Sequence, residues 1–378
     1  MTFKPNIEQS FPLMPYSQLV WDMMKYEPKI YNNQILLKVS KKQVDTEKIK
    51  NAFRKAFLNH PAFSTRIDEN GLQTFFDTND ILHGQFHSVD FTDEADSLKI
   101  SVSINRILGD GASGRILIED FIKAYLGEQL EKDNYANYLA QLEKYKLTER
   151  YQLHKQWLEQ HFAGDYPVHP RTDLPLSEKV ESYEALYFDD YTAQRTALTE
   201  LGVKYVVSLS AIVSLAACLA IMDYNGMDIS AITWAYEGRE KLEEQRVFGS
   251  LHRDIPLLIK KENSKAGLLR QIRQELRDGI SHSTYPYTLT PPYSDKWNYA
   301  VNVLQMDSVE SMLAIMPFPF EVLDTEKPRL AYSLLDIEIY DEQQLTIVYR
   351  YSSAHYKEES IRRFASLVRL HIEQLCRE

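Results

Sequence analysis

The chain has 378 residues, of which 44% are hydrophobic and 26% are charged, and its formal net charge is −11. This composition is typical of a globular protein long enough for two domains, and the acidic balance argues against nucleic-acid binding, which needs a basic footprint. With Cys218 and Cys376 as the only cysteines, a disulfide framework and a cysteine-rich metal site are excluded. The opening MTFKPNIEQSFPL has no apolar stretch typical of a signal peptide, so we expect a cytoplasmic protein.

Strand and helix signals alternate through the first part of the chain. Residues 34–40 favour a strand, and Asp45 is placed to cap a helix whose apolar residues recur every three or four positions up to Phe57. TRIDENGLQTFF (65–76) predicts two short strands around a turn. Alternating apolar residues predict a strand over 98–104, and helical spacing follows from 115 to 126. A long polar helical stretch covers about 131–162.

The segment AGDYPVHPRTDLPLSEKV (163–180) contains three prolines and few apolar residues, which is typical of a linker. We therefore place an N-terminal lobe at 1–165, a linker at 166–180 and a C-terminal lobe at 181–378. Strands are expected at 184–190, 229–238, 255–261, 299–306, 329–340 and 344–353, and helices at 193–201, 268–280 and 359–376. This mixture predicts an α+β fold.

The most apolar segment is YVVSLSAIVSLAACLAIM (205–222). It approaches the length of a membrane span, but it contains three serines and is not flanked by aromatic belts. We favour a helix buried inside the protein, and we expect no membrane insertion.

The segment SVSINRILGDGASG (101–114) places a guanidinium, that of Arg106, directly after the predicted strand. The chain has no G-x-S-x-G elbow and no G-x-x-x-x-G-K phosphate-binding loop, and the glycine-rich GDGASG (109–114) is not favoured as a phosphate cradle. None of its ten histidines forms an H-E-x-x-H motif, so we expect no metal site. Neither a nucleophile nor a metal is therefore evident from motifs alone.

An ordered series of segments resembles the condensation domains of nonribosomal peptide synthetases, in the chloramphenicol acetyltransferase superfamily. NRILGDGAS (105–113) corresponds to the family motif H-H-x-x-x-D-G-x-S, and HSTYPY (282–287) to H-x-x-x-P-F. The other matching segments are FPLMPYSQLVW (11–21), NHPAFSTRI (59–67), DNYANYLAQ (133–141), QWLEQHFAGDYPVHPRTDLP (156–175), AITWAYEGRE (231–240) and VFGSLHRDIPL (247–257). The resemblance runs from about residue 10 to 375 in the family's order.

The resemblance implies two chloramphenicol acetyltransferase-like lobes in a V shape with a central tunnel. It also implies floor-loop and latch-like segments in the C-terminal lobe, and phosphopantetheine-tethered substrates. In the family, the second histidine of the motif assists attack of an amine on a thioester. Here Asn105 and Arg106 replace the two histidines, Arg253 stands where the family has asparagine, and Ser64 stands where it has arginine.

Arginine cannot accept a proton near neutral pH, because its side-chain pKa is above about 12. Arg106 therefore has two open interpretations. In the first, Arg106 pairs with the Asp110 carboxylate, for which Arg66 is an alternative partner. In the second, Arg106 presents its planar guanidinium to a substrate carboxylate or phosphate. His252 is a candidate replacement base, with a packing role as its alternative.

The resemblance adds further candidate site residues. Arg106, Asp110 and His252 are the candidate catalytic residues. The candidate substrate-binding residues are Asn105, Gly111, Ser113, Trp234 and Asn302. Structural roles are also expected. Gly238 should adopt positive φ, and Arg239 should make a structural ion pair. His60 should make a structural hydrogen bond, and Ser113 should cap or pack near a helix start.

Two functions follow as hypotheses. The first is a stand-alone condensation-like domain that binds carrier-tethered acyl or peptidyl thioesters without the usual catalysis, and recruits a synthetase or tailoring enzyme. The second is an active acyltransferase or amide synthase that uses another catalytic residue and a thioester of a carrier protein or of coenzyme A. Neither needs a permanently bound cofactor, since the phosphopantetheine arm or coenzyme A arrives with the substrate. A protein-interaction role unrelated to thioesters is a third, less favoured, hypothesis.

Overall fold

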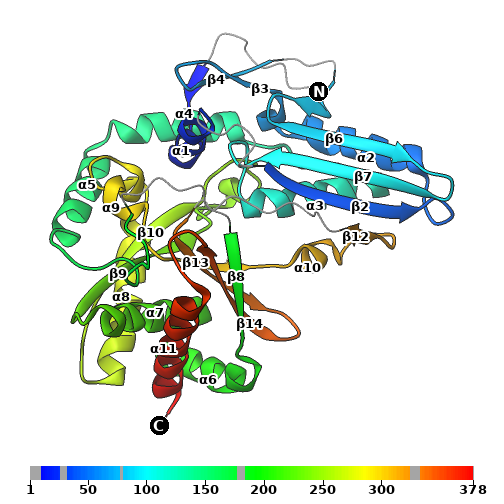
Figure 1. The fold of residues 1–378 in the computed structure, drawn as a ribbon. Helices are drawn as coiled ribbons and strands as arrows, with labels where there is room; N and C mark the ends of the chain where they lie inside the picture. The colour runs from blue at the N-terminus through cyan, green and yellow to red at the C-terminus, as the bar shows by residue number, and fades with distance from the viewer. Residues whose placement is uncertain (1–9, 26–31, 77–79, 177–183, 324–332, 378) are drawn as a thin grey trace. The chain divides into compact units, whose positions relative to one another are not determined.

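The structure is a computed structural model that describes residues 10–25, 32–76, 80–176, 184–323 and 333–377 (Figure 1). The chain divides into two compact units, and each is discontinuous in sequence. The first contains Met1–Thr148, Glu237–His252 and Val309–Lys327, and the second contains Glu149–Tyr236, Arg253–Ser308 and Pro328–Glu378. The predicted division into 1–165, 166–180 and 181–378 is therefore wrong in two respects. Residues 149–165 pack with the second unit, and two segments of the second half pack with the first.

Described residues of the first unit form a five-stranded antiparallel sheet, in the order β12-β2-β7-β6-β5, and a three-stranded sheet, β1-β4-β3. The strands are β1 (Ser10–Pro12), β2 (Asn32–Ser40), β3 (Thr65–Ile67), β4 (Leu72–Phe75), β5 (His83–Gly84), β6 (His87–Asp93), β7 (Ser97–Asn105) and β12 (Glu321–Leu323). The helices are α1 (Pro15–Met24), α2 (Thr46–Asn59), α3 (Gly111–Leu126), α4 (Tyr135–Lys146) and α10 (Val309–Leu313), with 3₁₀ turns η1 (Pro61–Ser64) and η3 (Leu242–Glu244).

The sequence pattern of α2 explains how the first unit buries its core. The Asp45 side chain accepts a hydrogen bond from the Lys48 N–H (3.1 Å), which confirms the predicted N-cap. The buried face of α2 packs against α3 and the sheet, where the Phe53 ring lies 4.5 Å from Phe121 and 5.7 Å from Phe91, measured between ring centroids. This packing joins α2 to α3 and to β6 of the sheet.

Described residues of the second unit form a six-stranded mixed sheet in the order β10-β9-β11-β13-β14-β8. Strand β11 is parallel to β9 and β13, and the other pairs are antiparallel. The strands are β8 (Glu184–Asp190), β9 (Ile229–Tyr236), β10 (Arg253–Lys260), β11 (Asn302–Met306), β13 (Leu335–Asp341) and β14 (Leu345–Ser352). The helices are α5 (Glu149–His161), α6 (Arg195–Tyr205), α7 (Leu209–Asn225), α8 (Lys265–His282), α9 (Ser294–Trp297) and α11 (Glu358–Cys376), with 3₁₀ turns η2 (Thr192–Gln194) and η4 (Tyr287–Leu289).

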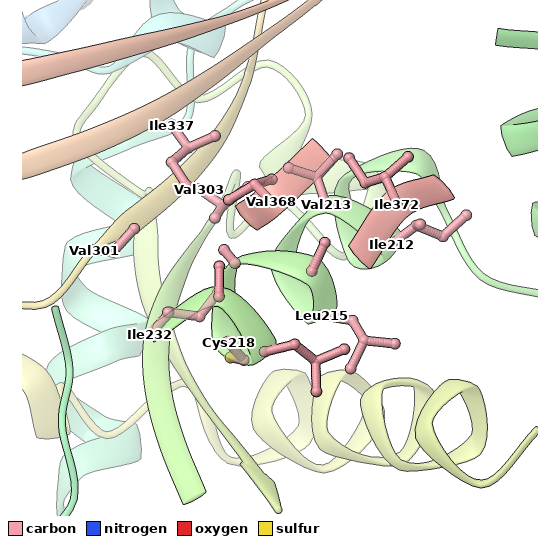
Figure 2. Packing of buried hydrophobic residues seen from close by; sticks show 14 of the residues in the cluster. Ile212, Val213, Leu215, Cys218, Ile232, Val301, Val303, Ile337, Val368 and Ile372 are labelled. Carbon is pink, nitrogen blue, oxygen red and sulfur yellow. The ribbon is translucent and has the colours of Figure 1, made fainter. Parts of the chain in front are cut away.

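Helix α7 forms the centre of the second unit's core, as Figure 2 shows. Every residue from 210 to 222 is buried, and their apolar side chains pack with those of the sheet and of α11. The prediction of a buried helix in this segment is confirmed. Among the described residues no single helix meets the length and apolarity of a membrane span, although one bent pair, Thr192–Tyr205 with Leu209–Asn225, does so by length and composition.

The remaining differences from the sequence analysis have local causes. Helix α3 begins at Gly111 rather than at 115, because Asp110 caps it. The helical stretch expected over 131–162 is two helices, and between them the Thr148 hydroxyl donates to the Tyr145 carbonyl (2.7 Å), a local bond that competes with helix continuation. Residues 1–9 of the N-terminal segment, 177–180 of the linker and 329–332 of a predicted strand lie outside the described residues.

Candidate functional site

The loop between β7 and α3 holds the residues that the sequence singled out. Strand β7 ends at Asn105, whose buried side-chain oxygen accepts a hydrogen bond from the Ile107 N–H (3.0 Å). The Ile107 carbonyl in turn accepts a hydrogen bond from the buried Ser17 hydroxyl of α1 (2.8 Å). Asn105 was a candidate substrate-binding residue. In the structure its side chain instead stabilises the loop that follows β7.

Arg106 lies just beyond the strand and is partly exposed. Its Nε lies 3.5 Å from the side-chain oxygen of Asn33 on β2, at the limit of a hydrogen bond. The predicted pairing of Arg106 or Arg66 with Asp110 is wrong, because that carboxylate is bound by Arg239. The Arg66 guanidinium instead stacks over the Phe76 ring at 4.3 Å.

The Asp110 carboxylate is the most heavily bonded group of the site. The Arg239 guanidinium donates to both of its oxygens, at 2.9 and 3.0 Å, and the backbone N–H groups of Ser113, Leu251 and His252 donate at 2.9, 2.9 and 3.0 Å. The side chain of Asp110 is 6% exposed and that of Arg239 is 2% exposed. Burial alone would raise the pKa of the Asp110 carboxyl, but the Arg239 charge and these donors hold the pKa below its ordinary value.

Arg239 also bonds the segment on which it lies. Its guanidinium donates to the backbone carbonyls of Val247 and Gly249, each at 3.0 Å. Gly238, immediately before it, has a φ of 69°, which supports the predicted need for glycine in this turn. The predicted structural ion pair of Arg239 is confirmed, and its partner, Asp110, is a contact between residues 129 positions apart that no local pattern could identify.

Ser113 completes the start of α3. Asp110 and Ser113 form a reciprocal capping box, in which the Asp110 N–H donates to the Ser113 hydroxyl oxygen (3.3 Å). The same oxygen accepts from the Gly249 N–H (3.1 Å), so Ser113 also ties α3 to the segment 246–252. The predicted capping role of Ser113 is confirmed. A Cβ placed on Gly111 meets no described atom within 4 Å, so this position leaves open space at the first turn of α3.

His252 lies in the same cluster. Its backbone N–H donates to Asp110, and its imidazole meets the Tyr16 ring of α1 edge-on, with centroids 4.5 Å apart. The side chain is partly buried. Tyr16 was not singled out from the sequence, where it is one of 24 tyrosines and no pattern sets it apart.

Trp234 and Asn302 both lie on the sheet of the second unit, but on opposite faces. Trp234 pairs in register with Val303, a core residue, and packs against the helix-covered core. Asn302 precedes Val303, so its side chain points to the other face, as successive residues of a strand do. Its buried side-chain oxygen has no hydrogen-bond partner among the described residues. The two residues therefore do not line one surface of this sheet.

His60 has the structural role expected of it. Its Nδ1 hydrogen-bonds the Asp133 carboxylate (2.8 Å), and its Nε2 lies 3.2 Å from Asp120. Burial alone would lower the pKa of His60, but the two carboxylates outweigh burial and raise the pKa above its ordinary value. Asp133 also accepts from the Phe248 N–H (3.2 Å), so this network holds the segment 246–252 from a second side. Among the described residues no group of three or more His, Cys, Asp or Glu side chains is arranged to hold a metal ion.

Comparison with known proteins gives one consistent result. The family model described as Condensation domain matches residues 86–378. One of the plipastatin synthase proteins of Bacillus subtilis is 22% identical over 285 residues, which are 70% of this chain and 8% of that protein. Surfactin synthase subunit 1 of the same organism is 22% identical over 308 residues, again 8% of its length. The chain thus spans a small part of these relatives.

Solved structures agree on the fold. The epimerization domain from the third module of tyrocidine synthetase B superposes with a TM-score of 0.76 at 19% identity, covering 99% of this chain and 98% of that one. The X-domain from teicoplanin biosynthesis superposes with a TM-score of 0.78 at 14% identity, covering 100% and 96%. The predicted α+β class and chloramphenicol acetyltransferase-like fold are confirmed.

Proposed function

This chain belongs to the condensation-domain family, and from that premise we propose that it binds carrier-tethered acyl or peptidyl thioesters without the family's usual proton transfer. One observation carries the proposal. The motif position that resembles the second histidine holds Arg106, and Asp110, four residues later, is fully engaged by Arg239 and three backbone donors. Neither group is available to accept a proton from an attacking amine.

The rest of the site favours retained binding. The loop 105–110 is held by Ser17 and Ser113, and the segment 246–252 is held against it by Arg239, so the scaffold around the motif is intact. Arg106 carries five N–H donors in a fixed plane, which suits a carboxylate or phosphate. The phosphopantetheine arm of a carrier protein or coenzyme A would bring the thioester, and a synthetase or tailoring enzyme would then act on the bound intermediate.

Binding to loaded carriers tests this proposal. An acyl group is attached through an amide analogue of the thioester to a phosphopantetheinylated peptidyl carrier protein, and the affinity is measured by calorimetry. We expect binding by the wild type, and weaker binding by Arg106→Ala. The control Arg54→Ala alters an exposed cation on α2 and should bind as the wild type does. Absence of binding to every loaded carrier and to coenzyme A thioesters contradicts the proposal.

A second function is an active acyltransferase that uses His252 as its base. One observation favours it: the His252 backbone is bonded to Asp110, and its ring packs on Tyr16, so an imidazole is fixed within the cluster. A general base contributes roughly 10² to 10⁴ in rate.

Turnover separates the two functions. With an acyl-carrier thioester and an amine or alcohol, the second function predicts transfer that falls by about 10²-fold or more in His252→Ala and survives Arg106→Ala. If the wild type, His252→Ala and Arg106→Ala all transfer the acyl group no faster than the uncatalysed reaction, the second function is contradicted.

A further inference from the structure

Helix α8 is a rigid element of the second unit. Ser264 caps its N-terminus by accepting from the Gly267 N–H (3.1 Å), and its inner face is buried. A Cβ placed on Gly279 would lie 2.4 Å from the Ile255 side chain, so the helix lies very close to β10. The Glu275 carboxylate also accepts from the Leu258 N–H of that strand (3.0 Å). The outer face of α8 therefore presents its side chains from a fixed platform.

That outer face carries three exposed arginines, Arg270, Arg273 and Arg277, which we call the α8 arginine stripe. Their spacing of three and then four residues places them on one side of the helix. Arg270 and Arg273 have no acidic residue three or four positions away on α8, and neither makes an ion pair with any described residue. Within the described part of the chain, Arg277 has a long contact with Asp278 (3.9 Å) and a bond to Gln274.

Such an arrangement costs helix stability. Like charges three or four residues apart destabilise a helix by a few tenths of a kcal/mol, and Arg270 and Arg273 have no acid at those spacings on α8 to offset this. The local charge is also unusual for this chain. Helix α8 carries four basic and two acidic side chains, a net +2, whereas the rest of the chain carries −13. A row of exposed arginines on an otherwise acidic protein attracts acidic partners and orients their approach.

We propose that the α8 arginine stripe is a docking surface for an acidic helix of a carrier protein. The inference rests on the proposed function, which requires a carrier partner, and it names where that partner binds. The three arginines span about 10 Å along the helix axis. Carboxylates that are spaced three and four residues apart on a partner helix span the same length, so each could face one arginine. Arginine suits this task because its planar fork binds carboxylates through two hydrogen bonds. The charge of the whole chain argues against nucleic acid as the occupant.

The experiment measures the affinity of the full chain for an acidic, phosphopantetheinylated peptidyl carrier protein at low and high salt. Charge reversal by Arg270→Glu with Arg273→Glu should weaken binding by about tenfold or more, because each reversal places like charges against the carrier. The salt dependence should become shallower in the same variant. The matched control is Arg54→Glu with Lys55→Glu, which reverses two exposed charges on α2 and should stay within about twofold of the wild type.

The outcomes separate this inference from the proposed function. Binding that is unchanged by the stripe variant but abolished by removing the phosphopantetheine arm overturns the stripe and leaves the proposed function standing. No binding by the wild type overturns both. Tighter binding of duplex DNA than of the carrier also overturns the assignment. Circular dichroism of each variant checks that its helix content and thermal unfolding match those of the wild type, so loss of binding with both unchanged supports the stripe.

Discussion

The buried ion pair between Arg239 and Asp110 gives the sharpest stability prediction. In Arg239→Ala the Asp110 carboxylate, 6% exposed in the wild type, loses two charged hydrogen bonds and keeps its charge in a buried position. Removing one partner of such a pair costs roughly 3–5 kcal/mol. The carbonyls of Val247 and Gly249 also lose their guanidinium donor, so we expect the upper half of that range.

Urea unfolding followed by circular dichroism measures this change as a difference in the free energy of unfolding. The double variant Arg239→Ala with Asp110→Asn removes the charge as well as its partner, so it should be less destabilised than the sum of the single variants by about 1–3 kcal/mol. Arg239→Lys, which keeps the charge but not the fork, should lie between wild type and alanine. A cost below about 1 kcal/mol for Arg239→Ala, or strict additivity in the double variant, refutes the reasoning.

Three further predictions concern the two cores and the buried histidine. Asp45→Ala should lower the free energy of unfolding by about 0.5–2 kcal/mol, because α2 loses its N-cap, and Asp45→Asn should restore most of it; an unchanged midpoint in urea would contradict the cap. Leu215→Ala, in the fully buried centre of α7, should cost about 2–5 kcal/mol, and an effect below about 1 kcal/mol would argue against that packing (Figure 2). His60 has a raised pKa in the folded protein, so its contribution is fully present below the ordinary histidine pKa of about 6.5 and is lost as pH rises through the folded value. The stability difference between wild type and His60→Gln should therefore shrink as the pH rises above about 6.5, and a difference that grows with rising pH would contradict the buried charge.

The sequence predicted those elements whose determinants are local. The strand predicted over 98–104, the Asp45 cap and the burial of α7 depend on residues within a few positions of one another, and all three are present, the strand one residue longer at each end. The positive φ of Gly238 is also a local requirement. Such features are accessible to pattern analysis because a turn, a cap or a period is complete within one segment.

The contacts of the site were less predictable because they join distant segments. The sequence offered Arg106, from the same motif as Asp110, and Arg66, from another matching segment, as partners for Asp110. The structure instead supplies Arg239, from the segment 237–252. The split of Trp234 and Asn302 onto opposite faces depends on strand register, which a single strand does not reveal. The unit boundaries depend in the same way on two later segments that pack with the first unit.

The residue at position 106 bears most directly on whether this domain transfers a proton, and single-turnover aminolysis measures its consequence. An acyl-carrier thioester and a saturating amine are mixed with the wild type, with Arg106→Ala, with Arg106→His and with Asn105→His/Arg106→His, and amide formation is followed against the uncatalysed rate. We expect no acceleration of the chemical step by the wild type, and a gain of up to about 10² to 10⁴-fold when histidine is placed at 106. Rapid amide formation by the wild type that persists in Arg106→Ala would contradict the proposed loss of proton transfer.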